Sequence, residues 1–100
     1  MRKIFEYEIP IEDEFELEMP ERAKILTFQA QNDKVYIWAI IDIGDRIIKV
    51  KFRMFGTGHL IKENTIGLSY VGTAQMADGQ LVWHLFKEKS LAEVVCGGIF

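Results

Sequence analysis

The sequence has few of the residues that build disulfides and metal sites. A single cysteine, Cys96, and two histidines, His59 and His84, occur in 100 residues. One cysteine cannot form an intramolecular disulfide, which fits a reducing compartment. One Cys and two distant His residues also fall short of the ligand set of a structural zinc ion. We therefore expect no bound metal and no cofactor.

Long apolar runs and proline are also scarce. No run approaches the roughly 18 apolar residues that suggest a membrane span, and residues 1–20 carry charges throughout, without the apolar segment of a signal peptide. The two prolines, Pro10 and Pro20, each follow a stretch of strand pattern. These absences predict a soluble cytoplasmic protein and no membrane partner.

The motifs of common enzyme classes are missing as well. The chain has no Gly-x-Ser-x-Gly elbow, no Walker phosphate loop, no His-Glu-x-x-His and no paired catalytic His and Cys. His59 beside Thr57 has the chemistry of a general base, but a lone loop histidine more often forms a structural hydrogen bond. We predict that the protein is not an enzyme.

An acidic amino-terminal segment is the clearest charge feature. Residues 6–21 hold eight carboxylates and no Lys or Arg, although the net charge of the chain is only −3. Alternation over residues 1–9 and 14–19 predicts two strands in a hairpin, with Glu8 opposite Glu16 and Glu6 opposite Glu18. Like charges across a strand pair are destabilising.

Two interpretations of the acidic pairs stay open. In one, a basic neighbour compensates for them, and the side chains available are Lys24, Lys49, Lys51 and Arg53. In the other, Glu6, Glu8, Glu16 and Glu18 form a patch that binds a basic partner or imitates nucleic-acid phosphate. Binding of nucleic acid itself is disfavoured by the acidic balance of the chain.

Three further strands are predicted at 22–31, 35–41 and 46–55, with a polar turn at 31–33. Pairing Ile41 with Arg46 makes a hairpin of the last two and places a continuous apolar set on one face: Val35, Ile37, Ala39, Ile41, Ile48, Val50, Phe52 and Met54. The other face then has Tyr36 across from Lys51 and Trp38 across from Lys49. Such a ladder suits either plain packing and self-association or a ligand surface, since rings stack on bases and cations bind phosphates.

The stretch 55–59 reads Phe-Gly-Thr-Gly-His at the end of this cationic strand. Two glycines free the backbone to take positive φ and to aim N–H groups at an anion, although a plain turn needs the same residues. The predicted ligand site joins this loop to the ladder and comprises Gly56, Thr57, Gly58, His59, Arg53, Lys51, Tyr36 and Trp38.

A final hairpin is predicted around Asp78-Gly79, the dipeptide typical of a type I′ turn. It places Tyr70, Gly72, Ala74 and Met76 on one face with Leu81, Trp83, Leu85 and the Lys87 stem, and His84 opposite Thr73. The glycine at 72 makes room for a bulky neighbour such as Trp83. Residues 90–93 match a capping box and Gly97-Gly98 would end a short helix.

About seven strands joined mainly by tight turns predict an all-β fold, mainly an antiparallel meander, closed into a small barrel or folded as a sandwich. We expect a single β domain over residues 1–87. Residues 88–100 form a C-terminal helical turn or tail that docks on the domain or on a partner.

Four stretches carry a resemblance to a known family. They are 1–4 with Tyr7, the break at 18–21, the loop at 55–59, and 81–86. Together they resemble a family of small uncharacterised proteins encoded by phages and prophages, in which an aromatic residue precedes Gly-Thr-Gly-His. The likeness spans residues 1–87 and implies a phage origin and the host cytoplasm, without a mechanism.

Two functions follow from these observations. The first is a noncatalytic homodimer or other homo-oligomer that inhibits or adapts a host protein, for example in host defence, through the acidic hairpin or the aromatic face. The second is sequestration of a small anionic ligand, such as a nucleotide signal, at the Gly-Thr-Gly-His loop.

Overall fold

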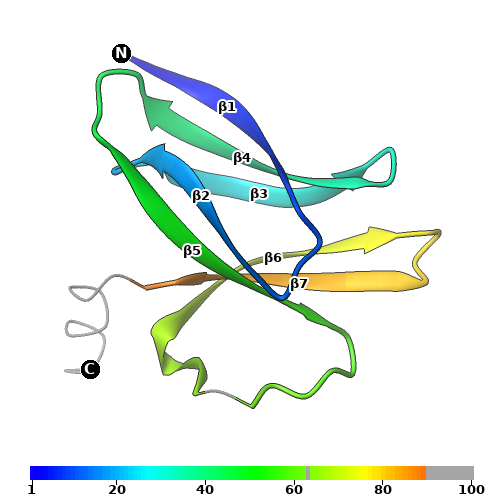
Figure 1. Cartoon of the computed structure of the whole chain (residues 1–100). Coiled ribbons are helices and arrows are strands. Elements are labelled where there is room, and N and C mark those ends of the chain that lie inside the picture. The colour runs from blue at the N-terminus through cyan, green and yellow to red at the C-terminus, as the bar shows by residue number, and fades with distance from the viewer. Residues whose placement is uncertain (63, 90–100) are drawn as a thin grey trace.

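The structure, a computed structural model, describes residues 1–62 and 64–89. It confirms the all-β prediction. Seven antiparallel strands and one short 3₁₀ helix follow in the order β1 Arg2–Ile9, β2 Glu14–Pro20, β3 Lys24–Gln31, β4 Lys34–Asp42, β5 Ile47–Gly56, η1 Thr65–Gly67, β6 Leu68–Met76 and β7 Leu81–Glu88. They form two separate sheets rather than a closed barrel, so the sandwich is the correct alternative (Figure 1).

One sheet has three strands in the order β1-β4-β3, and the other has four in the order β2-β5-β7-β6. Two predicted hairpins are therefore wrong. The first strand pairs with β4 instead of β2, and β5 pairs with β2 and β7 instead of β4. The physical reason is charge: β2 beside β5 sets Glu16 opposite Lys51 and Glu18 opposite Lys49, whereas β2 beside β1 sets carboxylates against each other.

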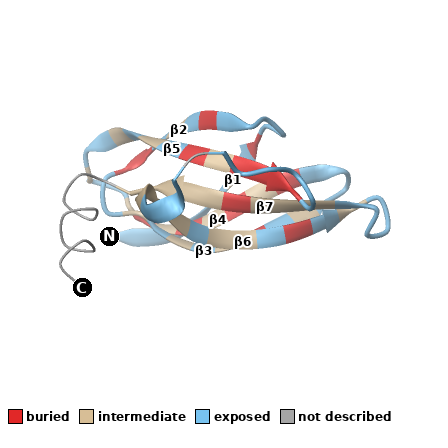
Figure 2. Cartoon of the chain, turned by 90° about the horizontal axis from the view of Figure 1, so that it is seen from below, coloured by how far each residue is buried: buried red, intermediate tan, exposed pale blue. Residues whose placement is uncertain are grey.

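The inward faces of the two sheets form one core (Figure 2). Alternation predicted these faces correctly even where it mispaired the strands. All four predicted core residues of β4 are buried, as are Phe52 and Met54 of β5, whereas Ile48 and Val50 are only half-buried. Which face a residue takes follows from its own strand, but how deeply it is buried depends on the neighbouring strands.

The third predicted hairpin, β6–β7, forms, and the predicted polar turn at 31–33 joins β3 to β4. Asn32 and Asp33 take positive φ between β3 and β4. At the β6–β7 turn, Asp78 and Gly79 have φ of 55° and 86°, and the Gln80 N–H donates to the Ala77 carbonyl at 3.1 Å. Positive φ at both central residues is the requirement of a type I′ turn.

A β-bulge alters the first half of β6. The register with β7 shifts between Tyr70 and Gly72. The extra residue turns Tyr70 to the outer face and Val71 toward the core, so the prediction that Tyr70 shares a face with Ala74 is wrong. The glycine itself makes room for Phe28 of β3 rather than for Trp83, because a Cβ at position 72 would lie 3.2 Å from the Phe28 Cβ.

The predicted capping box at 90–93 and the glycine pair at 97–98 lie outside the described residues. Within residues 1–62 and 64–89, no helix is long and apolar enough to cross a membrane.

Candidate functional site: a cationic cavity at the open end of the sandwich

The four-stranded sheet divides along β5. The second half of β5, Phe52–Gly56, pairs with β7, and its first two residues, Phe52 and Arg53, also pair with β2. The first half of β5 has β2 as its only partner among the described strands. On the amino-terminal side of Phe52, β5 and β7 are no longer paired. A cavity of about 660 Å³ opens there, between these two strands and the start of β3. We call this part of the molecule the open end of the sandwich.

The cavity has an aliphatic floor and a charged rim. The floor is built from β2, β3 and β5 and consists of Met19, Pro20, Ala23, Ile25, Ile48 and Val50. The described charged residues of the rim are five basic and two acidic: Arg46, Lys49, Lys51, Lys87, Lys89, Glu21 and Glu88. A site with excess positive charge around an apolar floor favours an anionic ligand with an apolar part.

The most informative of these side chains is Lys87. It lies directly opposite Phe52 in the β5–β7 ladder, and Phe52 is fully buried. Residues directly opposite each other share a face of the sheet, so the lysine stem leaves β7 on the core side, as its sequence pattern predicted. The same residue lines a smaller neighbouring cavity of about 220 Å³ against Ser69 and Val71. The stem of a basic side chain therefore starts on the core side of β7, and the residue lines the cavity.

Polar contacts hold the two turns at this end together. The Asp45 carboxylate accepts hydrogen bonds from the Arg22 backbone N–H at 2.8 Å and from its guanidinium at 3.4 Å. The Arg46 guanidinium donates to the Glu21 carboxylate, and the Glu21 N–H donates to the Arg46 carbonyl at 2.7 Å. The hydrogen bond from the Arg22 backbone, opposed by partial desolvation, lowers the pKa of Asp45. The side-chain hydrogen bond to Asp45 raises the pKa of Arg22.

The glycine loop at 55–59 makes most of its hydrogen bonds within the protein. The Gly56 N–H donates to His59 Nδ1 at 3.3 Å, the His59 N–H donates to the Gly56 carbonyl at 3.1 Å, and the Thr57 N–H donates to the Val82 carbonyl at 3.2 Å. Amides engaged in this way are not aimed at a ligand. The second glycine, Gly58, has φ of +88°, which suits a chain leaving a strand.

A chain of side-chain hydrogen bonds fixes this loop to the outer face of the four-stranded sheet. His84 bonds Thr57 Oγ1 through Nε2 at 2.7 Å and Thr73 Oγ1 through Nδ1 at 2.9 Å. The Tyr70 hydroxyl bonds the same Thr73 oxygen at 2.5 Å. The predicted His84–Thr73 pair is thus present, and the sequence missed Thr57 and Tyr70. The bulge in β6, which turns Tyr70 outward, has no clear sequence signal.

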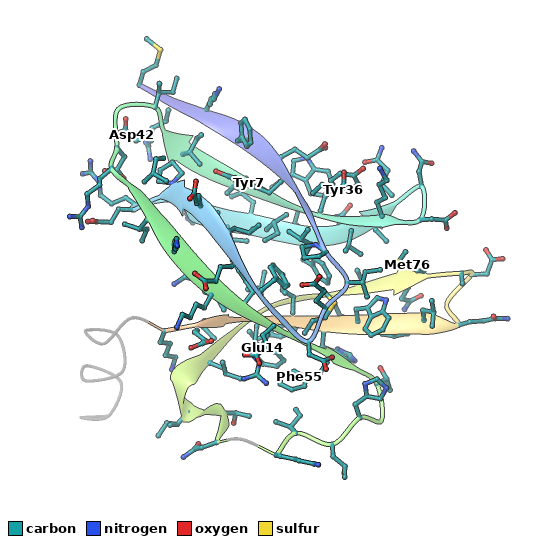
Figure 3. The ribbon with its side chains drawn as sticks, in the orientation of Figure 1. Tyr7, Glu14, Tyr36, Asp42, Phe55 and Met76 are labelled. Carbon is teal, nitrogen blue, oxygen red and sulfur yellow. The ribbon has the colours of Figure 1, made fainter. Side chains whose placement is uncertain are left out.

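The predicted ligand residues do not come together. Tyr36 (Figure 3) and Trp38 lie on the outer face of the three-stranded sheet, with ring centroids 5.7 Å apart. Lys51 and Arg53 belong to β5 of the other sheet. The Arg53 guanidinium lies 4.0 Å from Glu14 and 5.8 Å from the Phe55 ring centroid. Only Lys51 also lines the cavity.

The predicted acidic pairs also separate. Glu16 and Glu18 face Lys51 and Lys49, as the interpretation with a basic neighbour expects. Glu8 lies opposite Tyr36 and 3.6 Å from the Lys34 ammonium, and Glu6 lies opposite Trp38. The acidic segment is therefore shared between the outer faces of both sheets.

Fold and site together define a small two-sheet antiparallel β-sandwich with a cationic cavity at one end. Comparison with protein families matches residues 1–94 to DUF7352, a domain of unknown function, and the chain belongs to that family. Membership in an uncharacterised domain family agrees with the sequence prediction, and the match runs past residue 87, where the resemblance ended. No curated protein and no solved structure shows significant similarity to the chain.

Proposed function

We propose that this protein is a noncatalytic binding protein whose cavity at the open end holds a small anion with an aliphatic part. The observation that carries the proposal is Lys87, a cation on the core side of β7 beside an aliphatic floor. The proposal keeps the anionic ligand expected from the sequence and moves its site away from the Gly-Thr-Gly-His loop.

The charge balance of the rim supports an anion. Five basic and two acidic side chains line the cavity, so the basic excess is three. Three of the basic residues have acidic neighbours in the protein: Arg46 pairs with Glu21, and Lys49 and Lys51 lie opposite Glu18 and Glu16 of β2. In a partly enclosed site, a ligand carboxylate or phosphate gains more from such charges than it does on an open surface.

The floor favours an aliphatic chain over a nucleobase. No aromatic residue is among the described residues that line the cavity. Recognition of a base relies largely on stacking against rings, whereas Met19, Ile25 and Val50 offer contact to methylene groups, each worth about 0.8 kcal/mol when fully buried. A fatty-acid-like carboxylate therefore fits the floor better than a nucleotide does.

Calorimetric titration with octanoate, octanol, octylamine and AMP tests this proposal. We expect octanoate to bind most tightly and octylamine not to bind. Lys87→Met keeps the aliphatic stem and removes the charge. Loss of a hydrogen bond to a charged group costs about 1.5–3 kcal/mol, or about 10- to 100-fold in affinity. Octanol binding should change little.

Lys62→Met is the matched control, because Lys62 is exposed in the connection after β5. It should leave octanoate binding unchanged, and a thermal melt checks that both variants fold. Equal affinities of octanoate and octanol, or equal octanoate affinities of the wild type and Lys87→Met, would count against an anion site in the cavity.

A second candidate function is binding of another protein, with inhibition of a host protein in a phage context as the sequence-based proposal. The observation that favours it is the outer face of the three-stranded sheet. There Tyr36 and Trp38 are partly exposed, and Glu6 and Glu8 flank them on β1. Loss of a captured partner on Trp38→Ala, with the fold intact, would support this function, and an unchanged set of captured proteins would argue against it.

A further inference from the structure

The strands at the edges of the two sheets differ in how they are protected against pairing with another chain. β3 and β6 carry bulges and lie against each other, where Gly72 of β6 meets Phe28 of β3. β2 presents Glu14, Glu16 and Glu18 and ends at Pro20. Bulges, charges, proline and coverage by another element are the usual means of blocking an edge strand.

The first strand carries charged residues but has no bulge, no proline within it and no strand against its outer edge among the described residues. Its eight residues pair with β4 in a continuous register from Arg2 to Ile9, without a bulge. Among the described strands β4 is its only partner, and its other edge is open (Figure 1). Ile4 and Phe5 are 62% and 40% exposed. An open, regular and partly apolar strand is suited to pairing with a further strand.

Charge runs in one direction along this strand. Arg2 and Lys3 stand at its start, and Glu6 and Glu8 stand in its second half. A strand with this polarity is complementary to itself in antiparallel alignment, because the basic end of one copy meets the acidic end of the other. We propose that β1 pairs antiparallel with β1 of a second copy of this chain, joining two three-stranded sheets into one continuous six-stranded sheet.

The residue types select the register. The inward faces of both copies must lie on the same side of the joined sheet. Shifting one β1 strand by one residue relative to the other would place these faces on opposite sides. Setting Arg2 opposite Glu8 of the second copy satisfies this condition and pairs Phe5 with its own copy on the two-fold axis. A shift by two residues in one direction sets Glu6 against Glu6. A shift by two in the other direction sets Arg2 against Glu6 but leaves Glu8 with no residue opposite it, so fewer residues of the strand pair.

The proposal does not depend on the ligand cavity, because β1 is absent from the described cavity lining. It gives the predicted homodimer an interface that the sequence did not assign. A symmetric interface of this kind uses the same patch on both copies.

Sedimentation of two charge variants, alone and mixed, tests the proposal. Arg2→Glu sets Glu opposite Glu, and Glu8→Arg sets Arg opposite Arg, twice in each homodimer. Two like-charge pairs cost about 1–2 kcal/mol together, so each variant alone should dimerise about 5- to 30-fold more weakly than the wild type. An equimolar mixture should restore dimers, because the heterodimer contains two Arg–Glu pairs.

Glu12→Arg is the matched control, because it makes the same charge change in the exposed loop after β1 and should leave dimerisation unchanged. Glu8→Arg also loses the contact with Lys34, an exposed pair of small energetic value. A monomeric wild type at every accessible concentration would overturn the proposal. So would a wild-type dimer that neither reversal weakens.

A cross-link tests the register directly. In a Cys96→Ser background, Phe5→Cys should form a disulfide-linked dimer on mild oxidation, because residue 5 meets itself on the axis. Tyr7→Cys should form far less, because it faces Lys3 of the second copy. Equal cross-linking at both positions would rule out this register.

Discussion

The two halves of β5 follow the same alternating pattern but lie in different surroundings. Phe52 and Met54 are 0% and 3% exposed, whereas Ile48 and Val50 are only half-buried. The difference arises because β7 pairs with the second half of the strand and not with the first. The alternation of apolar and polar residues predicts which face of the sheet a side chain takes. Whether that side chain is fully buried depends on the neighbouring strand.

The two regions are also held together by different forces. The closed region relies on apolar packing, including stacked rings of Phe15 and Phe52 whose centroids lie 5.3 Å apart. The open end relies on exposed polar contacts, chiefly Arg22 with Asp45 and Glu21 with Arg46. Burial of apolar area is the larger and more dependable contribution to stability. The cavity proposed as a binding site lies at the end held by the weaker contacts, which is the usual location of adaptable regions.

The largest effect should come from truncation in the closed half of β5. Phe52→Ala removes a fully buried ring and should lower the free energy of unfolding by about 3–5 kcal/mol. Val50→Ala in the open half should cost only about 1 kcal/mol, because the side chain already contacts the cavity. Urea denaturation of both variants measures the difference. Equal losses would show that the two halves are equally packed.

Acid should weaken the open end through Asp45. Its pKa is lowered in the folded state, so ionisation of this carboxyl stabilises the protein above its unfolded pKa of about 3.9. That stability is lost as the pH falls through the lower folded pKa. Asp45→Asn should therefore reduce stability at neutral pH and flatten its dependence on pH between about 5 and 2.

Thermal melts across this pH range measure the effect. Asp33→Asn is the control, because Asp33 lies in the β3–β4 turn, where Asn tolerates the positive φ. If Asp45→Asn retained the full acid dependence of the wild type, the contacts of Asp45 would not be what holds the open end.

The smallest effect concerns the outer face of β5. Glu16→Lys sets a cation opposite Lys51 and should cost about 0.2–1 kcal/mol, reduced by added salt. Glu12→Lys, in the loop before β2, changes the net charge equally and should have almost no effect. Equal stabilities of the two variants would mean that the column of Glu–Lys pairs contributes nothing to strand pairing.

Local signals in the sequence predicted the strands, their inward faces and two hairpin turns. Asn32-Asp33 and Asp78-Gly79 specify turns because their backbones accept positive φ. The pairing between sheets was not predictable in the same way. The loops after Ile9 and after Asp42 carry the chain from one sheet to the other, and short loops there resemble hairpin loops. Only the charges indicated the correct pairing, because the glutamates of β2 are complementary to the lysines of β5.

The candidate site was less accessible to sequence reasoning. The residue types of the Gly-Thr-Gly-His stretch suit an anion site, yet the amides of Gly56, Thr57 and His59 donate hydrogen bonds within the protein. The cavity arises where the pairing of β5 with β7 ends, and no single residue in the sequence predicts where that pairing ends. Its one local signal was the basic residue at position 87, on the face that otherwise carries Leu85 and Trp83.

Octanoate affinity of the wild type and of Lys87→Met, measured by calorimetry, tests the proposed function most directly. We predict that the wild type binds octanoate more tightly than octanol and that Lys87→Met removes this preference while it keeps the fold. Binding of octanoate that is unchanged by Lys87→Met, or no binding to the wild type, would contradict an anion site at the open end of the sandwich.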